Sequence, residues 1–376
     1  MFPKESKMLI NKQDFHFRST IYLEEKVLNL SGLHPEKLPQ LFSWHTLKPL
    51  TSLAMVLYLT VSTSMTVFHY DFDVVVESIM LGFGVLRFLC KIAVFLYHND
   101  SFRCMMSDFE DPVFYSLTPE DLAHFRAKAK QTRILGLLHF SSVMVYTTFL
   151  AVSPFIFDKQ FQLVLIWEPL DLGVITYLCH LYGLCFAVFN HVSMDNVFMM
   201  MSTFAGCQFD VIISGLGRMD FGRHGESEVV LRANIVRHLH ILRFIKRMNK
   251  LVSYMALIQY LMSIMAICVT LFQIMKNPQG GSNYAFLLCM MVEIILYCWY
   301  GEAIKDKNDD LSRTLYLTNW EESHVKIRKM ILIIRERCKK PIRLEVGGFT
   351  SMTLNSFVNI MKSAYSSFTV LRQVYN

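Results

Sequence analysis

Residues 251–275 read LVSYMALIQYLMSIMAICVTLFQIM and contain no charged side chain. A helix needs about 20 mostly apolar residues to cross the roughly 30 Å hydrocarbon core of a bilayer, so this stretch predicts a membrane span. Other stretches that meet the same criterion are Leu47–Phe68, Val74–Tyr97, Ile134–Phe157, Leu172–Phe204 and Tyr284–Ile304. A further stretch, Phe349–Arg372, has the length of a span but is unusually polar. The sequence therefore predicts an all-α membrane protein with seven transmembrane helices.

The composition of the 376-residue chain agrees with a membrane protein. Only 18% of its residues are charged and 53% are hydrophobic, whereas soluble domains have about 25% charged residues. The first forty residues are polar and mixed in charge, so we expect no cleavable signal peptide. The nine cysteines lie in apolar or predicted cytosolic segments. We therefore expect no disulfide framework, no metal, no cofactor and no nucleic-acid partner.

The distribution of Lys and Arg among the connecting segments predicts the orientation of the chain. The segment after the fourth span holds eight of them, from Arg218 to Lys250, and the segment after the sixth holds eleven, from Lys305 to Arg343. The connections on the opposite side hold only Lys159 and Lys276. Because cytoplasmic loops are enriched in Lys and Arg, the N-terminus should be cytosolic and the C-terminus extracellular. This orientation is opposite to that of a G-protein-coupled receptor.

Two of the basic segments carry apolar side chains at helical spacing. One stripe is Leu231, Ile235, Leu239, Leu242 and Ile245, and the other is Ile327, Met330, Ile331 and Ile334. The first helix should run straight into the fifth span. We favour a packed intracellular anchor domain built from such helical extensions. The alternative is that these basic amphipathic helices lie on the membrane surface.

The last segment, residues 349–376, reads FTSMTLNSFVNIMKSAYSSFTVLRQVYN. One face of the helix that it predicts carries Asn355, Asn359, Lys362, Ser366, Val370 and Gln373. So many polar groups are too costly for a helix that faces lipid all round. The stripe fits a water-filled path closed by an apolar gate. Periodicity alone fits equally well an interior helix with satisfied hydrogen bonds.

The C-terminal fifth of the chain resembles the insect odorant receptor family. The resemblance rests on an ordered series of residues: Gly301-Glu302, Ser312, Tyr316, Trp320, Lys340-Pro341-Ile342, Gly347-Gly348-Phe349, Phe357, Lys362, Ser363, Ala364, Tyr365, Ser366, Phe368 and Leu371. Weaker matches extend over most of the chain at Lys91, Trp167-x-Pro169 and Asp195.

The resemblance implies a tetrameric, ligand-gated, non-selective cation channel in the plasma membrane of olfactory sensory neurons. In that family the seventh span of each subunit lines the pore, and odorant-tuned subunits work with a common co-receptor. The co-receptor has a much longer second intracellular loop than residues 205–250 of this chain, so the chain resembles a tuned subunit. The implied segments are 1–46, cytosolic; 47–204, the ligand-pocket bundle; 205–348, the extensions with spans five and six; and 349–376, the pore-lining span.

The resemblance also implies a gate at Val370 and Val374, with Gln373 between them. Where related gustatory receptors have the pattern Thr-Tyr-x5-Gln, this chain has Ser366-Ser367-x5-Gln373. It also carries Arg372 and Lys362 in the proposed cation path. These departures fit a subunit that depends on its co-receptor for conduction.

The expected odorant pocket lies in the outer halves of the spans, where we select Ile79, Phe83, Tyr146, Thr147, Leu150, Tyr177, His180, Phe286 and Met290. A small volatile needs an apolar cavity with one or two polar groups. Tyr146, Thr147, Tyr177 and His180 offer such groups, although ordinary interhelical packing explains each of them equally simply.

Three rival interpretations predict different features. A seven-span membrane hydrolase would need a metal site from His139, His180 and His191, and the seventh span has no His or Asp. A G-protein-coupled receptor conflicts with the predicted orientation. A gustatory-type relative would share the architecture and differ in its ligand. We therefore do not expect an enzyme.

Overall fold

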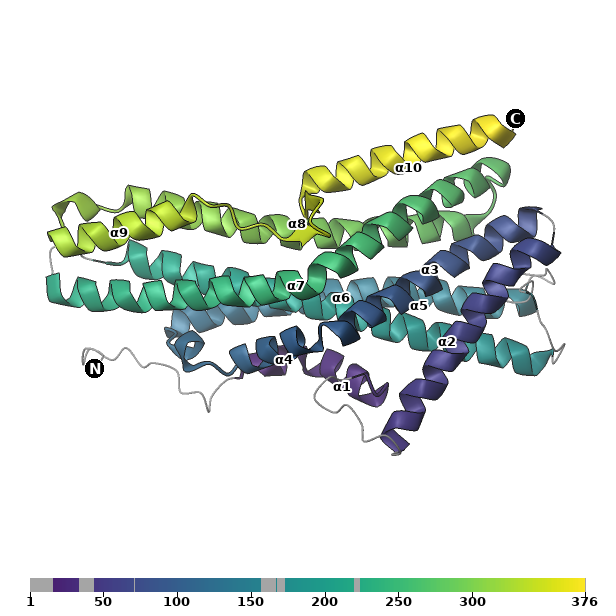
Figure 1. The fold of residues 1–376 in the computed structure, drawn as a ribbon, viewed down its shortest axis with the longest axis horizontal. Coiled ribbons are helices and arrows are strands. Elements are labelled where there is room, and N and C mark those ends of the chain that lie inside the picture. Colours follow the sequence, from purple (N-terminus) through teal and green to yellow (C-terminus); the bar gives the residue numbers. More distant parts are fainter. Residues whose placement is uncertain are drawn as a thin grey trace.

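A computed structural model describes residues 16–33, 44–70, 72–156, 167, 173–219 and 224–375. The chain order of its elements is η1 (Phe17–Ile21), α1 (Tyr22–Leu30), α2 (Trp44–His69), α3 (Phe72–Tyr97), α4 (Asn99–Asp108), η3 (Pro112–Tyr115), α5 (Pro119–Ile156), α6 (Val174–Gly217), α7 (His224–Lys276), α8 (Gly281–Leu317), η4 (Trp320–Glu322), α9 (Val325–Cys338), β1 (Glu345–Val346), β2 (Thr350–Ser351) and α10 (Leu354–Tyr375). Figure 1 shows the long helices running beside one another along the long axis of the molecule.

Within the described residues, six helices are long and apolar enough to cross a membrane: α2, α3, α5, α6, α7 and α8. Helices α2, α3, α7 and α8 each contain one of the apolar stretches predicted from the sequence. Helices α5 and α6 hold most of the other two: Phe157 and Leu172 lie outside the described residues, and Gly173 precedes α6. Some continue far beyond a span: α7 has 53 residues, which at 1.5 Å per residue is about 80 Å. The apolar stripe from Leu231 to Ile245 therefore does continue directly into the fifth span, as predicted. The extended parts gather with α9 at one end of the molecule (left in Figure 1).

The extended half has an aromatic core of its own. The ring of Phe204 in α6 lies 4.8–5.2 Å, centroid to centroid, from the rings of Phe17, Phe109, Phe114 and Phe244. All five side chains are fully buried, and the pairs adopt the edge-to-face geometry that aromatic quadrupoles favour. Because these rings come from η1, the end of α4, η3, α6 and α7, they join segments that are separate in the sequence.

The last helix begins later than the sequence predicts. Phe349, expected to open the seventh span, lies in the turn of the short antiparallel hairpin β1–β2, and α10 begins at Leu354. Gly347 and Gly348 adopt φ values of +59° and +78°, which glycine reaches without steric cost. The prediction of a helix from Phe349 is wrong because this glycine pair forms a tight turn instead.

Gly301 of α8 lets the residue just after the hairpin pack closely against α8. A Cβ at Gly301 would overlap with the carbonyl oxygen and Cβ of Met352. We expect Gly301→Ala to displace Met352 and the start of α10, which costs about 1–3 kcal/mol by analogy with other overpacked sites. Thermal unfolding of the purified protein measures the loss. Gly206→Ala is the control, because a Cβ there meets nothing within 4 Å, and equal loss in both variants would contradict the assignment.

Candidate functional site

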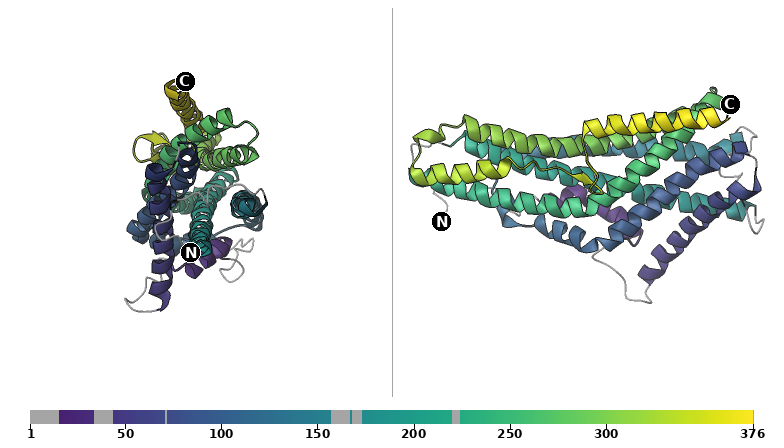
Figure 2. Two further views of the ribbon diagram at one scale, coloured as in Figure 1. Left: turned by 90° about the vertical axis from the view of Figure 1, so that its right-hand side faces the viewer. Right: turned by 45° about the horizontal axis from the view of Figure 1, so that its top comes forward.

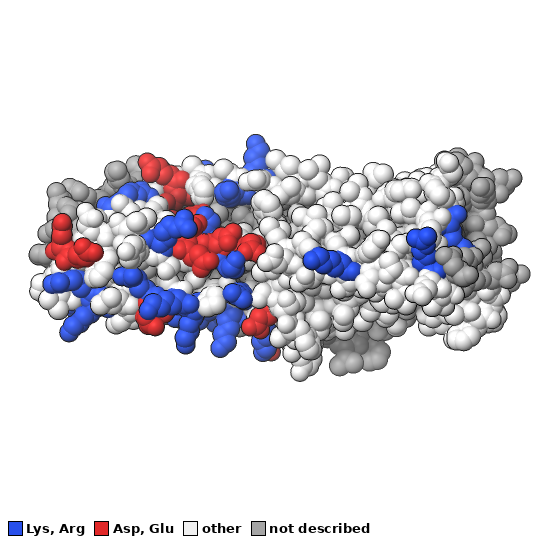
Figure 3. Space-filling view, turned by 90° about the horizontal axis from the view of Figure 1, so that it is seen from above, with Lys and Arg blue, Asp and Glu red and all other residues white. Residues whose placement is uncertain are grey.

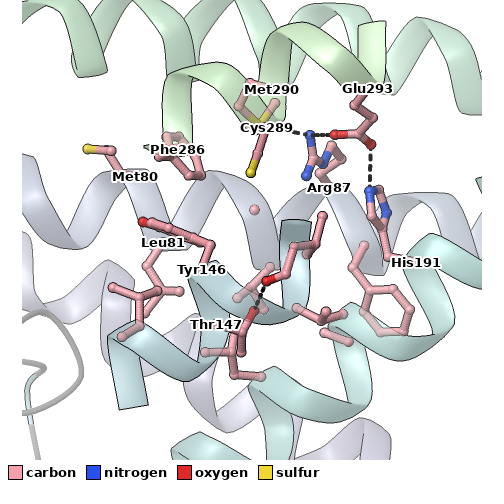
Figure 4. A pocket seen from close by; sticks show the side chains of 18 of the residues that line it. Met80, Leu81, Arg87, Tyr146, Thr147, His191, Phe286, Cys289, Met290 and Glu293 are labelled. Atoms are coloured by element: carbon pink, nitrogen blue, oxygen red, sulfur yellow. Dashed lines mark hydrogen bonds and ion pairs between the residues drawn. The ribbon is translucent and has the colours of Figure 1, made fainter. Parts of the chain in front are cut away.

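An internal cavity of about 90 Å³ lies between α3, α5, α6 and α8 (Figure 4). One water molecule needs roughly 10–15 Å³ measured in the same way, so the cavity has room for more than a single water. Most of its wall is apolar, and this part includes Met80, Leu81, Val85, Phe88, Val143, Leu150, Leu184, Phe286 and Met290. A smaller polar part carries Arg87, His139, His191 and Glu293. A mainly apolar cavity with a few polar groups is typical of a small-molecule site.

The cavity occupies one half of the helix bundle. Its lining residues come from the middle of α3, the second half of α5, the first half of α6 and the first part of α8. These parts lie toward the α2–α3 and α7–α8 connections and the C-terminus (right in Figure 1), away from the extended half. The sequence predicts the ligand pocket in this half.

The structure places five of the pocket residues selected from the sequence in the wall of this cavity: Tyr146, Thr147, Leu150, Phe286 and Met290. The rings of Tyr146 and Phe286 lie 5.3 Å apart, between centroids. These residues come from α5 and α8, so two helices far apart in the sequence meet at the cavity.

The other four selected residues do not line the cavity. Ile79 and Phe83 lie beside lining residues on α3 but on other faces of that helix. The hydroxyl of Tyr177 donates to the carbonyl oxygen of Ala151 at 2.5 Å. His180 is buried and stacks on Tyr58 with ring centroids 5.1 Å apart.

Sequence analysis did not select the polar part of the wall. Glu293 follows Met290 by three residues and Phe286 by seven, so all three occupy one face of α8. Arg87 and Glu293 were recognisable as charges in predicted spans, and such charges mark functional sites by default. The sequence pattern that could have revealed the polar part of the wall is therefore Glu293, a charge within a predicted span, one helical turn after the pocket residue Met290.

Glu293 joins three helices at the polar end of the cavity. One of its carboxylate oxygens lies 3.0 Å from Nη1 of Arg87, and the other lies 2.6 Å from Nε2 of His191. Arg87 belongs to α3, His191 to α6 and Glu293 to α8. Figure 4 shows the guanidinium and the imidazole converging on this one carboxylate.

Lys91 extends this network deeper into the bundle. Its ammonium nitrogen is 3.0 Å from Asp195 Oδ1 and 3.6 Å from Glu293 Oε1, and the side chain is fully buried. The hydroxyl of Tyr297 donates to the same Asp195 oxygen at 2.5 Å. Lys91 of α3 and Asp195 of α6 therefore form an ion pair inside the bundle.

Some of these side chains also test the alternative interpretation of the chain as a membrane hydrolase with a metal site. His191, Asp195 and Glu293 lie close enough together to hold a metal ion. However, Lys91 lies between the two carboxylates, and Arg87 binds one of them. Because these cations already neutralise the carboxylates, the arrangement is an ion-pair network, and a metal ion there would be repelled.

We expect Lys91→Met to destabilise the protein by about 3–5 kcal/mol, because removing one partner leaves a buried carboxylate without its cation. Thermal unfolding in detergent and abundance at the cell surface measure the effect. Lys339→Met breaks the solvent-exposed pair with Glu336 and should leave both readouts unchanged. Equal stability of the two variants would contradict a structural role for the buried network.

A sequence profile described as 7tm Odorant receptor matches residues 71–365, which is most of the chain. The chain belongs to this odorant receptor family. Odorant receptor 10 of Aedes albopictus is 28% identical to this receptor over 142 residues, which are 37% of this chain and 38% of that protein. Odorant receptor Or2 of Anopheles gambiae is 24% identical over 200 residues, 50% and 52% of the two chains. The chain thus spans about half of the length, or less, of these curated relatives.

The odorant receptor also shares its fold with a solved structure. The structure of the insect olfactory receptor OR5 from Machilis hrabei in complex with eugenol matches with a TM-score of 0.76 at 14% identity, covering 95% of this chain and 98% of that one. The shared architecture is an all-α fold with seven transmembrane helices, as the sequence predicts. The seventh is α10, which is too polar to be recognised as a span by hydropathy.

In this odorant receptor α10 packs through one face only. Ile360 and Ala364 are buried, and the helix lies against α7 and α8 at the edge of the bundle (Figures 1 and 2). The opposite face is exposed and carries the polar stripe predicted from the sequence. The three expected gate residues lie on exposed positions near the end of α10: Val370, Gln373 and Val374.

Proposed function

We propose that this chain is the odorant-binding subunit of a ligand-gated, non-selective cation channel. The observation that carries the proposal is the apolar cavity with a polar end inside the helix bundle of an odorant receptor. A cavity of this kind recognises a small, mostly apolar molecule. We place the receptor in the plasma membrane of olfactory sensory neurons.

The chemistry of the wall supports a volatile ligand. Tyr146, Phe286 and Met290 offer rings and a thioether, which are polarizable contact surfaces. The similar receptor OR5 was solved in complex with eugenol, which supports a small organic ligand for this cavity as well. We propose Tyr146, Thr147, Leu150, Phe286 and Met290 as direct contacts. Ile79, Phe83, Tyr177 and His180 then form a layer behind them.

The exposed face of α10 supports a pore. Asn355, Asn359, Lys362 and Ser366 lie on that face, and none of them is buried within the chain. Polar groups facing acyl chains are costly, so this face should be covered by other subunits around a water-filled path. Val370 and Val374 are 60% and 80% exposed at the far end of the helix. Apolar side chains at such a constriction can stop ions by dewetting.

Helix α8 connects the cavity with α10. Phe286, Met290 and Glu293 lie at the cavity, and Glu302 on the same helix accepts the backbone N–H of Leu354 at 3.2 Å. A ligand opens the channel only if it binds the open state better than the closed one. We propose that a ligand that shifts α8 also shifts the first turn of α10 and thereby the gate.

The charges on α10 support a partner of different sequence. Lys362 and Arg372 are both exposed on this helix. Four copies of this chain around one axis would place eight cations along a cation path, and like charges there repel the permeating ions. We therefore propose a heterotetramer with the common odorant co-receptor, in contact with membrane lipid.

The charge distribution supports the predicted orientation. Figure 3 shows Lys and Arg gathered over the extended half of the molecule, together with Asp and Glu, whereas the other half shows only a few Lys and Arg side chains on this face. Because positive residues stay on the cytosolic side, we propose that residues 205–348 contribute their extensions to an intracellular anchor domain. Residues 1–46 are then cytosolic, 47–204 form the ligand-pocket bundle and 349–376 line the pore.

Epitope tags test this orientation. A tag after Asn376 should bind antibody on intact cells, and a tag before Met1 should bind only after permeabilisation, because the C-terminus is extracellular and the N-terminus cytosolic. The reverse pattern would contradict the proposed orientation and would favour that of a G-protein-coupled receptor.

Val370→Ala tests the gate. The smaller side chain leaves a wider and wetter constriction, so we expect a higher ligand-free current in cells that also express the co-receptor. Whole-cell recording measures the current together with its reversal potential. Unchanged currents in a variant that reaches the cell surface would remove Val370 from the gate.

Phe286→Ala is the matched variant in the cavity. It removes a partly buried ring from the wall, so the ligand concentration for half-maximal current should rise by about tenfold, in line with the cost of losing apolar contact area. The reversal potential and the ligand-free current should not change. A change in ion selectivity here would mean that the cavity and the pore are not separate sites.

A further inference from the structure

His139 of α5 is a buried histidine in the wall of the cavity, with 2% of its surface exposed. Among the described residues, neither of its ring nitrogens has a hydrogen-bonding partner. Buried polar atoms are nearly always hydrogen-bonded, and each exception calls for an explanation. Because His139 lines the cavity and both of its ring nitrogens lack a partner within the described residues, a molecule in the cavity is the partner we infer for them.

Three other polar groups of the wall, Thr147, Arg87 and His191, each have at least one protein partner. The hydroxyl of Thr147 donates to the carbonyl oxygen of Val143 at 2.9 Å. Nη1 of Arg87 and Nε2 of His191 both contact Glu293, although Nε of Arg87 and Nδ1 of His191 lack partners within the described part of the chain. His139 therefore differs from these groups in having its whole hydrogen-bonding capacity available.

The charges around the cavity indicate a neutral ligand. The network contains two cations, Arg87 and Lys91, and two carboxylates, Asp195 and Glu293, which neutralise each other. An ionised ligand would leave water without gaining a free counter-charge, and burying an unpaired charge is very costly. A neutral imidazole has one N–H donor and one acceptor nitrogen. A hydroxyl group can satisfy either of them, whichever tautomer is present.

We propose that His139 is the hydrogen-bonding partner of the ligand, and that the ligand class is a neutral, mainly apolar alcohol or phenol. This inference rests on the proposed function, because it assigns a ligand chemistry to the same cavity. The apolar wall takes the carbon skeleton, and His139 takes the hydroxyl.

The test records currents from cells that express the receptor with its co-receptor. The probes are sets with one carbon skeleton each, such as benzyl alcohol, toluene and benzoate, together with straight-chain alcohols, alkanes and carboxylates. The wild-type receptor should respond at lower concentrations to alcohols or phenols than to the matching hydrocarbons, and the carboxylates should not activate it. If the wild-type receptor responds more strongly to hydrocarbons or carboxylates than to alcohols and phenols, the proposed ligand class is wrong.

The variant His139→Phe keeps a ring of similar size and removes both nitrogens. It should raise the half-maximal concentration for alcohols by about fivefold to tenfold, the usual effect of one neutral hydrogen bond, and leave hydrocarbon potency unchanged. His238→Phe is the matched control, because His238 of α7 is also buried and its Nε2 also lacks a partner within the described residues, but it lies outside the cavity wall and is no proposed ligand contact. It should change neither potency.

His139→Gln restores a donor and an acceptor and should recover part of the preference for alcohols. Equal shifts for alcohols and hydrocarbons in His139→Phe, or no recovery in His139→Gln, would show that His139 is only structural. If no probe drives current through wild-type receptor that has reached the cell surface, the proposed function itself fails. That outcome is distinct from currents that do not depend on His139.

Discussion

Lys91 buries its charge completely within the membrane-spanning bundle, and the packing of three helices depends on neutralising that charge. An unpaired ammonium in a low-dielectric interior is unstable, so α6 must bring Asp195 and α8 must bring Glu293 to within 3.0 and 3.6 Å of it. These contacts set how α3, α6 and α8 are rotated and displaced along their axes. The cavity lies directly beside them because Glu293 also holds Arg87 and His191 in its wall. The carboxylate of Glu293 therefore belongs both to the buried ion-pair network and to the wall of the candidate ligand site.

The same rule, that polar groups in a bilayer need polar surroundings, explains the position of α10. Hydropathy does not reveal this helix as a span, and it packs against α7 and α8 through a single face. The close approach at Gly301 and the turn at Gly347-Gly348 set the direction in which it leaves the hairpin. The polar face of α10 is therefore exposed on the surface of the single chain. We interpret that face as the part of the receptor that is completed only by assembly.

Individual residues show where sequence reasoning succeeded and where it failed. The apolar stretch 251–275 predicted a span, and the stripe beginning at Leu231 predicted its cytosolic continuation, because both depend on local periodicity. Phe349 was misplaced because a preference of two glycines for positive φ outweighed the helical pattern after them. Phe83 was selected by its depth along α3, but depth does not specify the face of a helix. Met80, Gly84 and Phe88 share the face that meets the cavity.

By itself, the sequence determined how many segments can cross a bilayer, which ends of them carry the positive charge, and that the last segment cannot be surrounded by lipid. These properties follow from length, apolar content and charge, which act locally on the chain. Only the tertiary structure decided that Arg87, His139, His191 and Glu293 share one cavity, because they come from four helices that are distant in the sequence. Their convergence depends on helix rotation and register, which are set by the packing of buried charges and side chains against one another.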